Sequence, residues 1–355
     1  MPVPASFPTK CLIESFRVIG MTVSPPRPKA RHVLWFLCAA CTALLLACPR
    51  PAIEAVREAL RLCCDTIIPS LFPFLVLSAL LTGLAPLAQL EALCSPLMGP
   101  LFHLSGSSAA VLALGFTGGY PVGVRTAAEL YREGRLGRAE TERLLAFCNN
   151  SGPGFLVGVM GVGVFGSSAV GVWLYGIHIL SALLVGLLFR FYGSSRESEP
   201  RRSAAPSAAP PKSLPRLFSD AVTDSFLAVL NICAFVLFFM IALRLLSFTG
   251  LLHLLAAGLE LLPPPFGMPE SLATALLAGI LELSTGAGCL QGAPLTAGTA
   301  ALASFLLGWG GLSVHCQSLI FLLDARLNCK TYLLGKGLQA IISAILAYVL
   351  FRLLL

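Results

Sequence analysis

The sequence predicts an all-α, polytopic transmembrane helical bundle with two related halves, each containing interrupted or re-entrant helices. Three observations indicate this fold class: 56% hydrophobic residues against only 12% charged ones, long stretches almost free of charge, and Gly and Pro inside those stretches. A soluble domain has roughly 25% charged residues, because its surface faces water. Since the charged fraction is about half of that, much of the surface is expected to face lipid.

The uncharged stretches are long enough to cross a membrane as helices. No Asp, Glu, Lys or Arg occurs from Leu144 to Phe189, and only Asp65 and Glu91 occur from Leu62 to Val124. A helix needs about 20 apolar residues to cross the hydrocarbon core. Each stretch therefore holds at least one span.

Composition also divides the chain into four segments. Residues 1–30 form an irregular, Pro-rich tail, and residues 31–192 form the first transmembrane half. Residues 193–216 are mostly Ser, Ala, Pro and Arg, which is typical of a flexible linker. Residues 217–355 form the second transmembrane half.

The two halves show the same order of features. Gly-Gly-Tyr-Pro-Val-Gly at 118–123 corresponds in order to Leu-Glu-Leu-Ser-Thr-Gly at 281–286. Asn-Asn-Ser-Gly-Pro-Gly at 149–154 corresponds to Gly-Trp-Gly-Gly-Leu-Ser at 308–313. Interrupted helices at matching positions of two halves are typical of transporters built by internal duplication. Whether such a repeat is inverted or parallel stays open.

The distribution of cations predicts an orientation. Segments 50–61, 125–143 and 190–216 hold most of the Lys and Arg, whereas 84–105 and 248–270 hold none. The positive-inside rule therefore places the first three in the cytoplasm. We also expect 106–124 to be a single span and 125–143 to be a water-facing helix.

The break at 149–154 is a candidate substrate site. Backbone groups freed by a break in lipid must find other partners. Asn149, Asn150 and Ser151 supply amide and hydroxyl groups, and Gly152 lets a ligand approach the backbone. The alternative is a packing kink whose amides bond to neighbouring helices. Two adjacent Asn and a Ser in an apolar run favour the site.

The break at 118–123 is a second candidate. Gly119, Tyr120, Pro121 and Gly123 are predicted substrate contacts, and Arg125 follows them. The planar cation of Arg125 could attract an anionic substrate. Equally, Arg125 could be the first residue of a cytoplasmic loop.

The second half contributes ionisable groups. Glu282 is an isolated carboxylate in an apolar stretch, and such a group is by default a functional candidate, here for a coupling ion, H+ or Na+. His315 is a candidate proton partner, or else a hydrogen-bonded packing residue. The predicted substrate contacts near these breaks are Ser284, Thr285, Gly311, Ser313 and Gln317.

Other function classes have no support in the sequence. It shows no metal-ligand spacing, nucleophile elbow or P-loop, so we expect no enzyme, no catalytic residue, no metal and no cofactor. The net charge of +7 comes mostly from loop Arg, which gives no reason to expect nucleic acid. The expected partners are a small-molecule substrate, the lipid bilayer and a coupling ion, and a homo-oligomer is left open.

Several strings together resemble a known family. They are Leu-Phe-Pro-Phe-Leu at 71–75, Gly-Tyr-Pro-Val-Gly at 119–123, Phe-Cys-Asn-Asn-Ser-Gly-Pro at 147–153, Glu-Leu-Ser at 282–284 and Gly-Gly-Leu-Ser-Val-His at 310–315. Over residues 60–355 the chain resembles the YlbJ-type sporulation integral membrane proteins. That family belongs to the nucleoside-recognition "Gate" domain group, and its architecture is similar to that of concentrative nucleoside transporters.

The resemblance implies a role in endospore formation. Such proteins are thought to lie in the mother-cell membrane around the forespore and to carry dipicolinic acid toward it. The resulting expectation is a secondary transporter of a small organic anion, dipicolinate, in the mother-cell or outer forespore membrane. Two alternatives remain: a transporter of nucleosides or other small polar solutes, and a structural sporulation membrane protein that transports nothing.

Overall fold

The computed structural model describes residues 28–84, 87–193, 213–261 and 268–355. All regular elements in this part of the chain are helical, in agreement with the predicted fold class. Most of the predicted tail at 1–30 and of the predicted linker at 193–216 lies outside the described residues, and the last three residues of the predicted linker belong to the helix that begins at Leu214.

The order of helices from α4 onward recurs from α10 onward. Each series has two helices, then two pairs interrupted by a break, and a closing helix. In the first half these are α4 (Ile68–Leu84), α5 (Leu87–Phe102), α6 (Ser107–Gly118) with α7 (Val122–Arg132), α8 (Arg138–Leu145) with the π-helical η2 (Gly154–Val164), and α9 (Ser168–Phe189). In the second half they are α10 (Leu214–Phe248), α11 (Leu251–Glu260), α12 (Glu270–Leu281) with α13 (Leu283–Cys289), α14 (Ala297–Trp309) with α15 (Gly311–Asp324), and α16 (Cys329–Leu354). Three further elements precede α4: α2 (Pro28–Ala47), α3 (Pro49–Leu62) and η1 (Cys63–Ile67).

Five helical stretches among the described residues are long and apolar enough to cross a membrane. They are 49–81 (α3 to α4), α9, α10, 297–324 (α14 with α15) and α16. The segments 91–102 and 107–118 would add a sixth if they formed one span, but they meet at an angle of 91°. Large apolar side chains such as Phe238, Leu334 and Val349 are exposed on the outer faces of the long helices, as expected of surfaces that contact lipid.

The predicted single span at 106–124 is wrong, because the chain reverses at residues 119–121. A Cβ atom added to Gly115 or to Gly123 would clash with the same carbonyl oxygen, that of Cys148. Two residues eight apart in a continuous helix lie roughly 12 Å from each other. Helices α6 and α7 therefore form a re-entrant hairpin, packed through glycines.

Helices α12 and α13 form the matching hairpin in the second half. A Cβ atom on Gly286 would lie 2.6 Å from the backbone nitrogen of Gly279, so here too two helices cross through glycines. The reversal occurs at Glu282, whose extended backbone ends one helix and begins the next.

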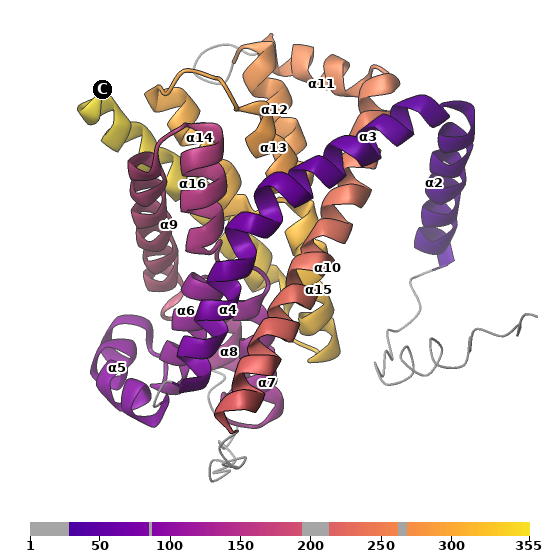
Figure 1. Ribbon diagram of the computed structural model, residues 1–355. Helices are drawn as coiled ribbons and strands as arrows, with labels where there is room; N and C mark the ends of the chain where they lie inside the picture. The colour runs from indigo at the N-terminus through magenta and orange to yellow at the C-terminus, as the bar shows by residue number, and fades with distance from the viewer. Residues whose placement is uncertain (1–27, 85–86, 194–212, 262–267) are drawn as a thin grey trace, which may run out of the picture.

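The prediction that 50–61 lies on the same side of the membrane as 125–143 is also wrong. Helices α3 and α4 form one long rod that runs antiparallel to α10 (Figure 1). Gly83 near the end of α4 packs on Leu217 near the start of α10, whereas Glu58 on α3 pairs with Arg244 near the end of α10. The basic start of the rod is therefore at the end of the bundle opposite to the start of α10, and the rod is long and apolar enough to cross the membrane in between.

Segment 84–105 lies with the cationic face rather than opposite to it. Figure 1 shows α5 at the same end of the bundle as α7 and α8. The guanidinium of Arg135 is 2.7 Å from the carboxylate of Glu91, and Arg190 donates to the carbonyl of Pro100 at 2.8 Å. This face still carries segments 125–143 and 190–193, so the positive-inside rule assigns it to the cytoplasm.

Segment 125–143 is not one water-facing helix. It forms α7 and α8, and three of the four charged residues of α8, Glu140, Glu142 and Arg143, are buried. Glu140 accepts hydrogen bonds from the backbone of Ser105 at 2.6 Å and from the hydroxyl of Ser108 at 3.2 Å. Arg143 donates to the carbonyls of His103 and Tyr192 at 2.8 and 3.1 Å. Helix α8 thus joins the start of α6 to the end of α9.

Candidate functional site

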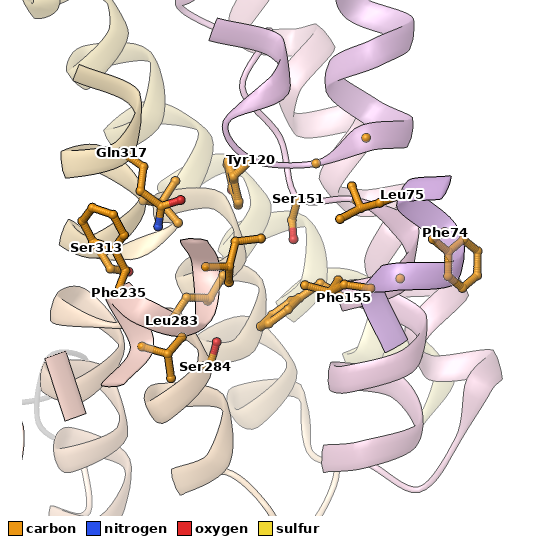
Figure 2. A pocket seen from close by; sticks show the side chains of 18 of the residues that line it. Phe74, Leu75, Tyr120, Ser151, Phe155, Phe235, Leu283, Ser284, Ser313 and Gln317 are labelled. Carbon is orange, nitrogen blue, oxygen red and sulfur yellow. The ribbon is translucent and has the colours of Figure 1, made fainter. Parts of the chain in front are cut away.

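A pocket lies between the two halves, at the level where their helices are interrupted. It contains about 640 Å³ of empty space, part of it open to the surroundings. Figure 2 shows Phe74, Ser151 and Phe155 on one side and Phe235 and Gln317 on the other. Both hairpin tips, both breaks and the middles of α4 and α10 line the pocket, through Leu71, Phe74, Leu75, Thr117, Gly118, Gly119, Tyr120, Ser151, Gly152, Gly154, Phe155, Ile232, Phe235, Val236, Glu282, Leu283, Ser284, Ser313, Val314 and Gln317.

Each hairpin tip packs on the break of its own half. A Cβ atom on Gly119 would lie 3.0 Å from the backbone nitrogen of Gly152. A Cβ atom on Gly311 would lie 3.0 Å from the backbone nitrogen of Leu283. Gly310 and Gly311 have φ values of +89° and +82°, a left-handed conformation that favours glycine. Main chain therefore meets main chain at both contacts.

Glu282 caps the N-terminus of α13 with its carboxylate. One oxygen accepts from the backbone of Ser284 at 3.0 Å, and the other accepts from the backbone and the hydroxyl of Thr285 at 2.6 and 2.8 Å. A helix N-terminus attracts negative charge through its free N–H groups and its dipole. A carboxylate of the protein thus already occupies this anion-binding position beside the pocket.

Further hydrogen-bonding groups at the pocket have no protein partner. Among the described residues, the backbone N–H groups of Gly119, Tyr120 and Gly152 donate to no acceptor. The Oε1 atom of Gln317 is buried without a partner. Helix α15 begins without a side-chain cap, and Ser313 in its first turn lines the pocket. These groups can bind a polar ligand without breaking existing bonds.

A polar network lies directly behind the first-half wall of the pocket. The ammonium of Lys336 donates to Tyr120 Oη at 3.2 Å, to the Asn149 carbonyl at 3.0 Å and to Gln339 Oε1 at 2.8 Å. The amide nitrogen of Gln339 donates to Asn150 Oδ1 at 2.9 Å, and the amide of Asn150 donates to the Phe147 carbonyl at 2.8 Å. Helix α16 therefore holds the unwound segment 146–153 in place.

The network continues to both sides. The Asn149 amide donates to Ser318 Oγ at 2.9 Å and to Tyr332 Oη at 3.1 Å. Nδ1 of His315 lies 2.9 Å from the same Tyr332 hydroxyl. On the other side, the backbone N–H of Ser151 donates to Nε2 of His178 at 3.1 Å. The break at 149–154 thus contributes Ser151 and Gly152 to the wall of the pocket and Asn149 and Asn150 to the buried network.

The structure brings half of the sequence-predicted site residues to the pocket. Those that line it are Gly119, Tyr120, Ser151, Gly152, Glu282, Ser284, Ser313 and Gln317. Asn149, Asn150, Thr285, Gly311 and His315 lie just behind the wall, and Pro121 and Gly123 belong to the hairpin packing.

Arg125 does not line the pocket. Its side chain is 61% exposed on α7 and forms an ion pair with Glu129 at 2.9 Å. This position agrees with the alternative that Arg125 begins the cytoplasmic segment.

Sequence reasoning missed Lys336, Gln339 and the apolar side chains from α4 and α10. For Lys336 a signal existed, because an ionisable residue inside a span is a functional candidate. No single-sequence signal marks which faces of α4 and α10 point to the pocket.

This fold and this site define a multi-pass, transporter-like membrane protein with a pocket between two halves. A family model for nucleoside recognition, called Gate, matches residues 65–188, which run from η1 almost to the end of α9. The sporulation integral membrane protein YlbJ of Bacillus subtilis (strain 168) is 31% identical over 327 residues, covering 88% of this chain and 80% of that protein. The chain belongs to the family of YlbJ-type sporulation integral membrane proteins. No solved structure shows significant similarity to the chain.

Proposed function

We propose that the protein is a secondary transporter of a small organic anion, and that in a spore-forming host this anion is dipicolinate. Transport would take place across the mother-cell or outer forespore membrane, toward the forespore. The observation that carries the proposal is the pocket at the meeting point of two re-entrant hairpins and two broken helices, one of each from either half. Broken helices at the middle of a membrane are tolerated where they line a substrate path.

The chemistry of the pocket suits a flat aromatic acid. The side chains of Phe74, Phe155 and Phe235 supply apolar and aromatic surface. The free backbone N–H groups at the first hairpin tip and break, and the uncapped start of α15, supply donors for carboxylate oxygens. A planar dianion with an aromatic ring matches both kinds of surface.

Glu282 is the proposed coupling residue. Its carboxylate lies at the pocket and repels an incoming anion as long as it is charged. A bound H+ or Na+ removes this repulsion, so that the anion and the cation would move together. His315 is not part of this proposal, since it bonds to Tyr332 behind the wall.

The description of the matching family model favours a second candidate, a nucleoside transporter. Gln317 and Ser313 could bind ribose or base as well as a carboxylate. A structural protein of the sporulation membrane, without transport, is the third candidate. The two transport candidates differ in the charge of the solute, and the third predicts no flux.

The test is uptake of labelled dipicolinate into proteoliposomes that contain the purified protein. We expect saturable uptake that uridine does not compete for and that depends on an imposed H+ or Na+ gradient. Gln317→Leu should reduce uptake at least tenfold, because it removes a polar group from the pocket. Gln291→Leu is the matched control, since Gln291 is exposed in the loop after α13 and away from the pocket.

Each outcome points to one candidate. Uptake of uridine in place of dipicolinate would replace the anion with a nucleoside. Absence of flux for both, from folded protein under either gradient, would favour the structural role. Equal uptake by the two Gln variants would mean that the substrate path lies elsewhere.

A further inference from the structure

Lys336 is a buried cation that the pocket lining alone does not account for. Its side chain is fully buried in α16, well inside a predicted span. All three of its hydrogen bonds go to uncharged groups: a phenol, a backbone carbonyl and an amide oxygen. Within the described part of the chain, no carboxylate pairs with it.

Such a charge is expensive inside a membrane. Cations in spans are usually paired with an acid or line a path for ions or substrates. Uncharged dipoles stabilise an ammonium only in part, because desolvating the charge costs more than single hydrogen bonds return. The site is therefore electrostatically incomplete, and a negative charge from outside the chain would complete it.

The position of Lys336 connects it with the pocket. Its ammonium lies 5.0 Å from the centre of the Tyr120 ring and 3.2 Å from its hydroxyl, and Tyr120 lines the pocket. It also donates to the carbonyl of Asn149, two residues before the pocket residue Ser151. One layer of protein separates the charge from a ligand, and the interior of a protein screens charge far less than water does.

We propose that Lys336 sets the charge preference of the pocket, so that carboxylate ligands bind more tightly than uncharged ligands of the same shape. Lys336 acts on the ligand through the first hairpin tip and is a positioning and selectivity residue. The inference deepens the proposed function, on which it rests for the pocket as the place where substrate binds. It also separates the two transport candidates, because an uncharged nucleoside gains little from a fixed cation.

The experiment compares two ligands of nearly the same shape, one a dianion and one uncharged, in which an amide NH2 replaces one oxygen of each carboxylate. Purified protein in detergent is titrated calorimetrically with dipicolinate and with the uncharged pyridine-2,6-dicarboxamide. We expect the wild-type protein to bind the dianion about 30-fold more tightly or better, the lower range for a buried charge pair. Lys336→Met should bring the ratio of the two affinities close to one. Lys330→Met, an exposed cation at the start of the same helix, should leave the ratio unchanged.

The ratio of the two affinities shows whether Lys336 selects for charge or only stabilises the fold through its hydrogen bonds. If Lys336 only fastens α16 to the hairpin tip, Lys336→Met lowers both affinities by the same factor, and the inference is overturned while the proposed function stands. A wild-type protein that binds both ligands equally overturns it as well. A wild-type protein that binds neither ligand overturns the inference together with the proposed substrate.

A second variant covers the case that Lys336→Met does not fold. Gln339→Glu places a carboxylate at the position of the amide oxygen that lies 2.8 Å from the ammonium. It neutralises the charge inside the protein and keeps the lysine in place. We expect it to lower the dianion preference at least tenfold, and an unchanged preference contradicts the proposal.

Discussion

Helix α16 packs so closely on the break at 146–153 that the addition of one methyl group, at Gly335, should push the two apart. A Cβ atom on Gly335 would overlap the carbonyl oxygen of Ala146 and would lie 2.6 Å from its carbonyl carbon and Cα. Ordinary van der Waals contact begins at 3.4 Å, so relieving the two carbon contacts alone requires α16 and the break to move apart by about 0.8 Å, and the closer oxygen requires more. The bond from Lys336 to the Asn149 carbonyl, now 3.0 Å long, would then exceed hydrogen-bonding distance.

The cost of Gly335→Ala follows from these two changes. Overpacking costs about 1–3 kcal/mol, and a lost hydrogen bond to a charged group costs about 1.5–3 kcal/mol. We therefore expect a loss of about 3 kcal/mol or more in the free energy of unfolding. By the scaling for chains somewhat shorter than this one, that lowers the melting temperature by about 6 °C or more.

Gly337→Ala is the matched control in the same helix. Nothing lies within 4 Å of a Cβ atom at this position. Alanine is the better helix former by about 1 kcal/mol, so the melting temperature should stay the same or rise slightly. The assay is thermal unfolding in detergent, followed by circular dichroism at 222 nm. Equal melting temperatures for the two variants would refute the proposed packing of α16 on the break.

Three further predictions concern the tips and the orientation. Tyr120→Phe should destabilise the protein by about 1–3 kcal/mol in thermal unfolding, because it leaves an α14 carbonyl and one N–H of Lys336 without a partner; an unchanged melting temperature would contradict those bonds. Glu282→Ala should lower the free energy of unfolding by about 0.5–2 kcal/mol, because it removes a helix cap. Glu282→Gln keeps one acceptor, so it should lower the free energy of unfolding less, and it should make dipicolinate uptake independent of the ion gradient. Equal losses for the two variants would contradict the cap. In a cysteine-free background, a membrane-impermeant thiol reagent should label Thr249→Cys on intact cells and Lys330→Cys only after permeabilisation, and the reverse pattern would invert the orientation.

The breaks could be predicted because they are local. Asn149, Asn150 and the glycines at 310–311 interrupt apolar runs, and a free backbone in lipid needs such residues. The bounds of α9, Ser168–Phe189, follow from its uninterrupted apolar composition for the same reason.

What the sequence does not reveal depends on distant contacts. Residues 118–121 mark an interruption, but whether the chain continues or reverses is decided by Gly115 and Gly123 meeting the Cys148 carbonyl. The prediction of the side of the membrane on which 50–61 lies was wrong for a similar reason. A helix that starts with Arg can itself be the start of a membrane-crossing rod. Lys336 joins the site only because α16 packs on a segment far away in the sequence.

The hydroxyl group of Tyr120 has one proton, and it donates that proton across the boundary between the halves, to the carbonyl of Leu307 at 2.7 Å. Any displacement of the first hairpin tip relative to α14 must break this bond. The phenol would then present a free donor at the pocket, where a carboxylate can accept it. A carboxylate ligand would replace the hydrogen bond that the movement breaks. The same hydroxyl would then bond to the Leu307 carbonyl when no ligand is bound and to the ligand when one is.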